Sequence, residues 1–99
     1  MAWRRKSQTI LRISVDQKPE EAVIALEGRI AGPWVAELKR VWAGLAQSLK
    51  ARKLLIDLRN TTYADASGIQ ALREIHSQTA AQFVTSTPWT EYLAEEVTR

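Results

Sequence analysis

The strongest constraint on the fold is the apolar run Leu54-Leu55-Ile56-Asp57-Leu58, which follows a long amphipathic segment. In that segment, residues 33–50, apolar side chains recur at three- and four-residue spacing, which predicts a helix with one wide apolar face. Pro33 suits the first helical position, whose N–H has no partner inside a helix. A short apolar run after such a helix is typical of a strand buried on both faces in a parallel sheet. Strand, helix and strand then predict a right-handed crossover.

Two strands are expected before the helix. Residues 10–15 alternate between apolar and polar side chains, and residues 22–26 are apolar throughout. The polar segment between them contains Pro19 and is short, so an antiparallel hairpin is the default. Residues 28–33 are expected to turn the chain into the helix, and residues 59–62 to end the central strand.

Three elements are expected after the central strand: a helix over residues 66–79, a short strand over 82–86 and a last helix that Thr87 caps. The predicted order is β-β-α-β-α-β-α, an α/β fold with a small mixed sheet and helices packed mainly on one face. Residues 10–99 form this single domain, and residues 1–9 are a basic tail. Three tryptophans at helical core spacing are expected to be buried: Trp34, Trp42 and Trp89.

Composition limits the classes of function. The chain has 99 residues, of which 25% are charged, and no cysteine, which excludes disulfides and thiol chemistry. The net charge is only +3, and the one tight basic cluster, Arg4-Arg5-Lys6, lies in the tail. Nucleic-acid binding would need a basic face with interleaved aromatic side chains, so it is not expected. The longest apolar runs are far shorter than a membrane span, so membrane insertion is not expected either.

No arrangement typical of catalysis is found. On a helix, Ser67 and the one histidine, His76, would lie ~13.5 Å apart along the axis and half a turn out of phase, too far for a nucleophile and its base. His76 is instead expected to pack at the apolar edge of its helix. Asp57 could face Asp65 at the end of the sheet, but nothing marks the cleft that paired carboxylates need. No catalytic residue, metal ligand or cofactor is expected, because glycine-rich phosphate loops and ligand clusters are also absent from the sequence.

The segment Tyr63-Ala64-Asp65-Ala66-Ser67-Gly68-Ile69 joins the central strand to the second helix. Asp65 is predicted to cap that helix, because its carboxylate can accept the free N–H groups. Gly68 serves either tight packing of the helix or the close approach of a partner. Ser67 is either a polar residue tolerated in a first turn or a regulatory hydroxyl, whose phosphate the helix N-terminus would favour and Asp65 would repel.

Three segments in this order resemble STAS domains, the family of sulfate transporters and anti-sigma factor antagonists. Leu26-Glu27-Gly28-Arg29-Ile30 is similar to the family's segment after the second strand, residues 54–58 to its central strand and residues 63–69 to its signature. The resemblance covers about residues 10–97. It implies a STAS-like fold and a cytoplasmic, non-enzymatic interaction module of bacterial signalling and transcription regulation. Its partner would be an anti-sigma factor that is also a serine kinase. A phosphatase would remove the phosphate that this kinase adds.

The resemblance also implies the surface that binds the partner, at the start of the second helix and the loop after the second strand. By position in this sequence its residues are Asp65, Ala66, Ser67, Gly68, Ile69, Gly28, Arg29 and Gly32. In the family the kinase modifies the first hydroxyl after the signature aspartate, a position that Ala66 occupies here. A first hypothesis is that the domain binds its partner constitutively.

A second hypothesis moves the phosphorylated residue from position 66 to Ser67, or to Thr61 or Thr62 in the loop before the helix. A third places the domain in the branch that forms cytoplasmic accessory subunits of ABC-type lipid or solute transporters, where the partner is a transporter ATPase. The family usually has another strand and helix after the position of residues 89–97. The last sheet edge is therefore expected to be open, covered by a partner or paired in a homodimer.

Overall fold

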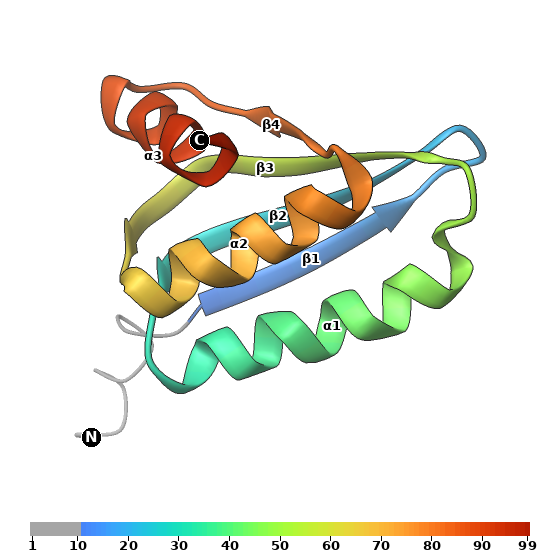
Figure 1. Ribbon diagram of the computed structural model, residues 1–99, viewed down its shortest axis with the longest axis horizontal. Coiled ribbons are helices and arrows are strands. Elements are labelled where there is room, and N and C mark those ends of the chain that lie inside the picture. The colour runs from blue at the N-terminus through green and yellow to red at the C-terminus, as the bar shows by residue number, and fades with distance from the viewer. Residues whose placement is uncertain (1–10) are drawn as a thin grey trace, which may run out of the picture.

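The computed structural model describes residues 11–99, so the predicted basic tail lies outside the described residues. The elements follow one another in the predicted order β-β-α-β-α-β-α (Figure 1). Their bounds are β1 Leu11–Gln17, β2 Glu21–Ile30, α1 Pro33–Leu49, β3 Lys53–Ala64, α2 Ala66–Thr79, β4 Gln82–Val84 and α3 Pro88–Thr98.

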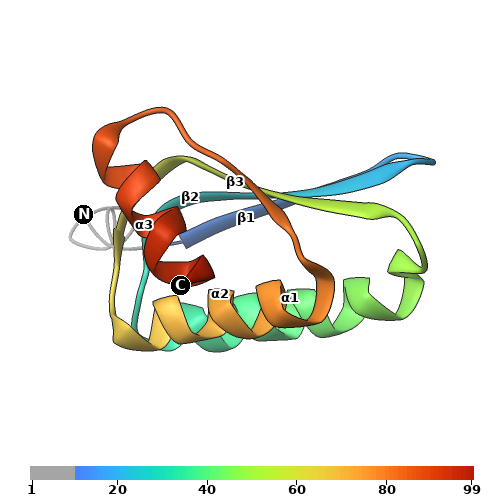
Figure 2. The same ribbon diagram turned by 45° about the horizontal axis from the view of Figure 1, so that its top comes forward.

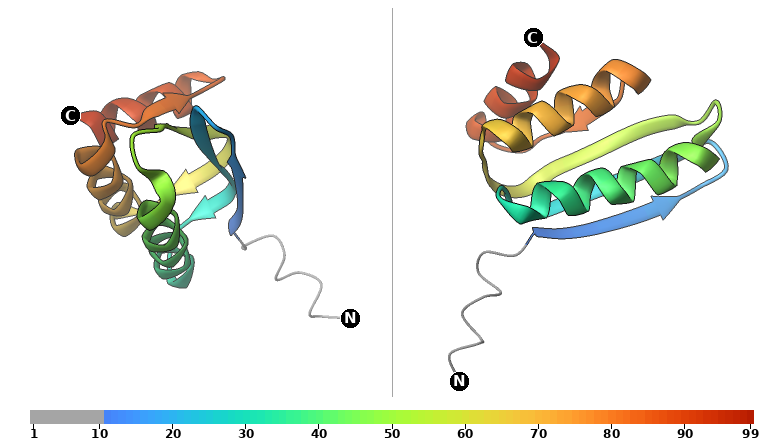
Figure 3. Two further views of the ribbon diagram at one scale, coloured as in Figure 1. Left: turned by 90° about the vertical axis from the view of Figure 1, so that its right-hand side faces the viewer. Right: turned by 60° about the horizontal axis from the view of Figure 1, so that its bottom comes forward.

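The four strands form one mixed sheet in the order β1-β2-β3-β4. β1 runs antiparallel to β2, whereas β2, β3 and β4 are mutually parallel. α1 and α2 lie next to each other along one face of this sheet, and α3 packs against α2 and β3 (Figures 2 and 3). The hairpin, the crossover and the one-sided helical layer are therefore as the sequence predicts.

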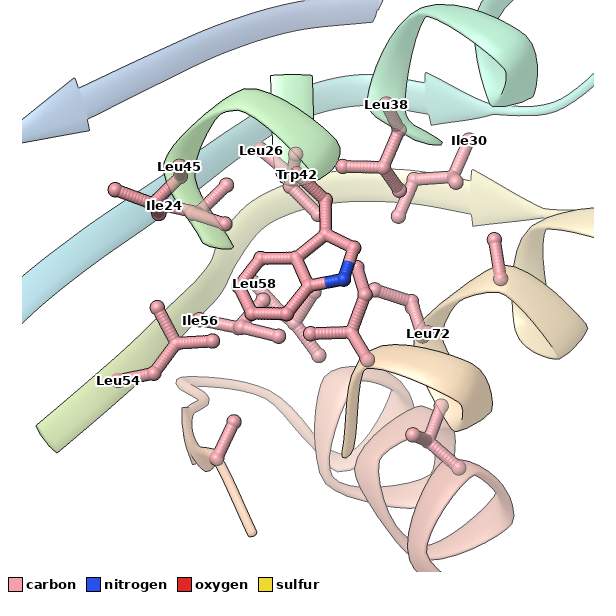
Figure 4. Close-up of a cluster of buried hydrophobic side chains, with 14 of the residues drawn as sticks. Ile24, Leu26, Ile30, Leu38, Trp42, Leu45, Leu54, Ile56, Leu58 and Leu72 are labelled. Atoms are coloured by element: carbon pink, nitrogen blue, oxygen red, sulfur yellow. The ribbon is translucent and has the colours of Figure 1, made fainter. Parts of the chain in front are cut away.

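The core lies between the helices and the covered face of the sheet. Trp42 of α1 is 9% exposed, and its indole lies among aliphatic side chains from β2, β3 and α2 (Figure 4). Its Nε1–H donates to Oε1 of Gln78 on α2 at 3.3 Å, which satisfies the one polar atom of the ring. Alternate residues of β3, Leu54, Ile56 and Leu58, are buried, while Leu55 is half-buried. The prediction that this strand is buried on both faces is wrong, because helices cover only one face.

Two strands extend further than predicted. β2 continues through Arg29 to Ile30, so the turn before α1 is only Ala31 and Gly32, and β3 continues through residues 59–62 instead of ending there. The parallel ladder holds across two register shifts, the second next to Gly28, whose φ of 108° favours glycine. Backbone pairing with β2, rather than a run of apolar side chains, keeps the polar residues 59–62 extended.

Trp89 is the exception among the tryptophans expected to be buried. It is 37% exposed, whereas Trp34 is half-buried against the core. The inner stripe of α3 is instead Thr90, Leu93 and Val97. Thr90 faces inward because its hydroxyl and that of Thr87 form a capping box at the start of the helix.

Candidate functional site

Asp65 connects the starts of two helices. Its Oδ1 accepts hydrogen bonds from the Gly68 N–H at 2.8 Å and the Ser67 hydroxyl at 2.7 Å, so Asp65 caps α2 as predicted. Its Oδ2 accepts the N–H of Gly32 at 3.1 Å. Gly32 is the N-cap residue of α1, a helix whose start has no hydrogen bond from a capping side chain at this position. A single carboxylate therefore holds the β2–α1 turn against the β3–α2 junction.

The hydrogen bonds to Asp65 also favour its ionised form. The Ser67 hydroxyl is the largest cause, followed by the N–H groups of Gly68 and Gly32, and together they lower the pKa of the Asp65 carboxyl below its usual value. The carboxylate is thus charged at neutral pH, as a cap of a helix N-terminus should be.

Gly68 is required for the close approach of α2 to the sheet. A Cβ on Gly68 would lie 2.2 Å from the carbonyl oxygen of Ile30, closer than any real contact. The same carbonyl accepts the N–H of Asp65 at 3.1 Å. Of the two roles considered for this glycine, tight packing of the helix is the one that the geometry explains.

The structure brings together the two segments that the resemblance implies, residues 28–32 and 65–69, at one end of the sheet (Figure 1, where both lie at the left). Their exposed side chains and backbone belong to Arg29, Gly32, Ala66 and Ser67, whereas Gly68 is buried. Ile69 is partly buried and packs against the core. Apart from Arg29, the exposed residues of this end are small, and they lie on a backbone that hydrogen bonds to Asp65 hold in place.

Thr61 and Thr62 do not lie in a loop, because β3 contains both. Thr61 is only 4% exposed, and its hydroxyl donates to the Leu26 carbonyl at 2.9 Å. The Thr62 hydroxyl donates to the Gly28 carbonyl at 3.1 Å. Both hydroxyls thus bond to β2 at the place where the ladder changes register, which is a structural role.

Asp57 and Asp65 do not form a carboxylate pair. Asp57 is hydrogen-bonded to the Arg59 side chain, with Nη2 of Arg59 at 2.9 Å from Oδ2, and this bond is the main cause that lowers the pKa of the Asp57 carboxyl. His76 is half-buried with its ring 5.9 Å from that of Phe83, the packing role predicted for it. Within residues 11–99 no three side chains of the metal-binding types gather, and no helix is long and apolar enough to cross a membrane.

Sequence reasoning missed one contact at this end. The guanidinium of Arg29 lies over the ring of Tyr63, with 4.4 Å between its Cζ and the ring centroid. The two residues are partners in the β2–β3 register. The pairing of Arg29 with Tyr63 can be predicted only if both strands reach these residues. The sequence predicts strands that end before them, at residue 26 and at residues 59–62.

Comparison with known proteins gives the fold. No family model matches the chain, and no curated protein sequence does. Among solved structures, an anti-sigma factor antagonist from Mycobacterium paratuberculosis superposes with a TM-score of 0.74 at 16% identity, over 88% of this chain and 77% of that one. The chain therefore has the fold of this anti-sigma factor antagonist, and the STAS-like fold that the sequence resemblance implied is confirmed.

Two further structures are similar at lower scores. An antisigma-factor antagonist STAS domain from Rhodobacter sphaeroides has a TM-score of 0.46 at 14% identity, over 79% of this chain and 87% of that one. An uncharacterised protein with a SpoIIAA-like fold from Shewanella loihica has a TM-score of 0.43 at 11% identity, over 86% and 92%.

Proposed function

We propose that the protein is a non-enzymatic interaction module that binds an anti-sigma factor of the serine kinase class in the bacterial cytoplasm and so acts in transcription regulation. The observation that carries the proposal is the junction at Asp65, where one carboxylate fixes the starts of α1 and α2 beneath exposed Gly32, Ala66 and Ser67. The fold shared with an anti-sigma factor antagonist supports it.

The geometry of the junction suits docking of a protein. Small side chains at Gly32, Ala66 and Ser67 let the surface of a partner approach the backbone closely. The hydrogen bonds to Asp65 already order both segments, so binding need not order them. A surface that is fixed before binding loses less entropy on association, which raises affinity for a given contact area.

Ser67 is the residue through which we propose that binding is switched. Ala66 has no hydroxyl, Thr61 is buried and Thr62 lies within the paired strand β3, whereas the Ser67 hydroxyl is exposed in the first turn of α2 and bonds to Asp65. A phosphate on Ser67 would replace that hydrogen bond with a charge of about −1.5 to −2 beside the carboxylate. The repulsion would loosen the contact from Asp65 to Gly32 and change the surface that the partner meets.

Affinity capture from the source cell tests the proposal directly. The full chain serves as bait, beside Ala66→Arg, which places a long charged side chain on the proposed surface. Ala46→Arg is the matched control, since Ala46 is likewise exposed on a helix but lies near the C-terminal end of α1, away from Asp65. Wild type and Ala46→Arg should recover the same serine kinase, and Ala66→Arg should recover at least tenfold less, with all three baits melting within a few degrees of one another.

The identity of the captured protein separates the alternatives. A transporter ATPase in place of a kinase would support the accessory-subunit hypothesis and contradict the proposal. Equal recovery by Ala66→Arg would place the docking surface elsewhere. Phosphosite mapping on the same bait tests the switch, which requires modified Ser67 and is contradicted by modification confined to other residues.

A further inference from the structure

Arg29 and Tyr63 form a stacked pair at the edge of the proposed docking surface. Ile30 is buried and Ala64 packs against the core, so their neighbours Arg29 and Tyr63 point to the helix-free face of the sheet. Both side chains are exposed, Tyr63 to 41%. The next residue along β2, Ile30, accepts the hydrogen bond from Asp65. The pair therefore borders the Asp65 junction directly.

Within the described part of the chain, the guanidinium of Arg29 has no hydrogen-bond acceptor. Among residues 11–99, Arg29 and Arg12 form no hydrogen bond or ion pair to an oxygen. Every other described arginine does: Arg40, Arg52, Arg59, Arg73 and Arg99. The residues before β1 contain no aspartate or glutamate, so they supply no side-chain carboxylate either. Arg29 is thus a cation that forms no ion pair with a carboxylate within residues 11–99.

The ring of Tyr63 gives this cation a defined orientation. A guanidinium stacked on an aromatic face is attracted by the ring and keeps its N–H groups directed outward in its own plane. Those groups match a carboxylate in the bidentate geometry that makes arginine–carboxylate bonds strong. Because the ring holds the guanidinium in place, less side-chain entropy is lost when the carboxylate binds.

We propose that the Arg29–Tyr63 pair binds a carboxylate side chain, from an aspartate or glutamate of the protein partner, at the rim of the docking surface. The proposal rests on the proposed function for the nature of the partner, and it adds the chemistry that the partner must present. A partner that places a lysine or arginine at this rim would be repelled, so the pair also selects among partners.

Binding of a carboxylate probe tests the pair without knowledge of the partner. The full-length, isotope-labelled protein is titrated with the blocked tripeptide acetyl-Gly-Glu-Gly-amide, and with acetyl-Gly-Gln-Gly-amide as the matched neutral probe. The Arg29 Nε–H and the Tyr63 ring protons should shift saturably with the glutamate peptide and not with the glutamine peptide. Arg12 is exposed and equally unpaired within residues 11–99 but does not stack on a ring there, so it is the internal control and should shift several-fold less.

Two variants separate the roles of charge and ring. Arg29→Gln should weaken binding of the glutamate peptide about tenfold or more, the loss of a charged hydrogen bond. Tyr63→Leu keeps the cation and should weaken binding about threefold. Equal shifts at Arg12, an unchanged affinity in Tyr63→Leu, or tighter binding of inorganic phosphate than of the glutamate peptide would overturn the proposal. Both variants alter exposed side chains, so both should fold, and the dispersion of their amide spectra is the check.

Failure of this proposal differs from failure of the proposed function. If the captured kinase binds the wild type and Arg29→Gln equally, the protein is still an interaction module, and only the carboxylate assignment is wrong. If no kinase is recovered while the peptide titration succeeds, the pair is a carboxylate site and the proposed function is wrong.

Discussion

The two ends of the sheet are each fixed by one charged side chain, but they differ in what remains on the surface. At the Asp65 end, residues 28–32 and 63–69, a carboxylate accepts hydrogen bonds from both helix starts. At the Arg52 end, residues 17–21 and 48–53, a guanidinium donates to oxygens of the β1–β2 hairpin and of the last turn of α1. Both are internal ties between segments that are distant in sequence.

The difference lies in the groups left over. The Arg52 guanidinium makes four hydrogen bonds to oxygens of its own chain, namely the carbonyls of Lys18, Ser48 and Leu49 and the side chain of Gln17. The Asp65 end presents the exposed Ser67 hydroxyl and the exposed guanidinium and ring of the Arg29–Tyr63 pair. A tie whose donors are mostly used within the chain mainly stabilises the fold, whereas one that leaves oriented polar groups exposed beside it also prepares a surface for a partner.

The largest expected effect comes from Gly68→Ala. The new Cβ would lie 2.2 Å from the Ile30 carbonyl oxygen, so α2 must move away from the end of β2. We expect the free energy of unfolding to fall by about 3 kcal/mol or more, measured by urea denaturation. Gly44→Ala is the matched control, because nothing lies within 4 Å of its added Cβ.

Gly44→Ala should raise stability by about 0.5–1 kcal/mol, the usual gain for alanine inside a helix. If the two substitutions have similar effects, the close approach of α2 to β2 at the Asp65 end is wrong.

Arg52→Ala should have the second largest effect and should act on stability alone. Loss of its hydrogen bonds to the hairpin and to α1 is expected to lower the free energy of unfolding by about 1–2 kcal/mol. Affinity for the captured partner should stay within twofold of wild type. Weaker binding at unchanged stability would assign docking to the Arg52 end and reverse the comparison.

Asp65→Ala should lower stability less than Gly68→Ala and should also change its pH dependence. Loss of the cap is expected to lower the melting temperature by roughly 4–8 °C at neutral pH. Because the pKa of Asp65 is lower in the folded state, its stabilising contribution is complete above the ordinary carboxyl pKa of 3.8 and is lost as the pH falls below it. The difference between wild type and Asp65→Ala should therefore shrink in melts below pH 3.8.

Asp57→Ala provides the comparison for the acid range, since the pKa of Asp57 is lowered mainly by Arg59, away from the junction. The Asp57→Ala variant should lose less stability than wild type when the pH falls from neutral to acidic, and its binding to the partner should not be weakened.

A difference in stability between wild type and Asp65→Ala that stays constant from neutral to acidic pH would show that the charge on Asp65 does not hold the junction.

Ala66→Ser should have the smallest effect on stability. Position 66 is exposed in the first turn of α2, so the hydroxyl needs no buried partner and the free energy of unfolding should change by less than about 0.5 kcal/mol. The new hydroxyl stands at the position that the family's kinases modify, and the captured kinase should phosphorylate it. A kinase that binds this variant without modifying it would contradict the inference from the family.

Local sequence patterns predicted the elements, their order and the cap at Asp65, because helical spacing and a capping residue act over a few positions. Contacts between β2 and β3 could not be predicted in the same way. The bond from Gly32 to Asp65 spans 33 positions and depends on the register of two parallel strands. That register passes through Thr61 and Thr62, which were expected to lie where the strand ends but belong to β3 and bond to β2 through their hydroxyls. The stacking of Arg29 on Tyr63 was missed for the same reason.

Hydrogen exchange of the protein with and without its captured partner tests most directly whether the Asp65 end is the docking surface. Backbone amides of residues 28–32 and 65–69 should exchange more slowly in the complex, and amides of residues 17–21 and 48–53 should be unchanged. Slower exchange at the Arg52 end, with none at the Asp65 end, would contradict the proposed docking surface.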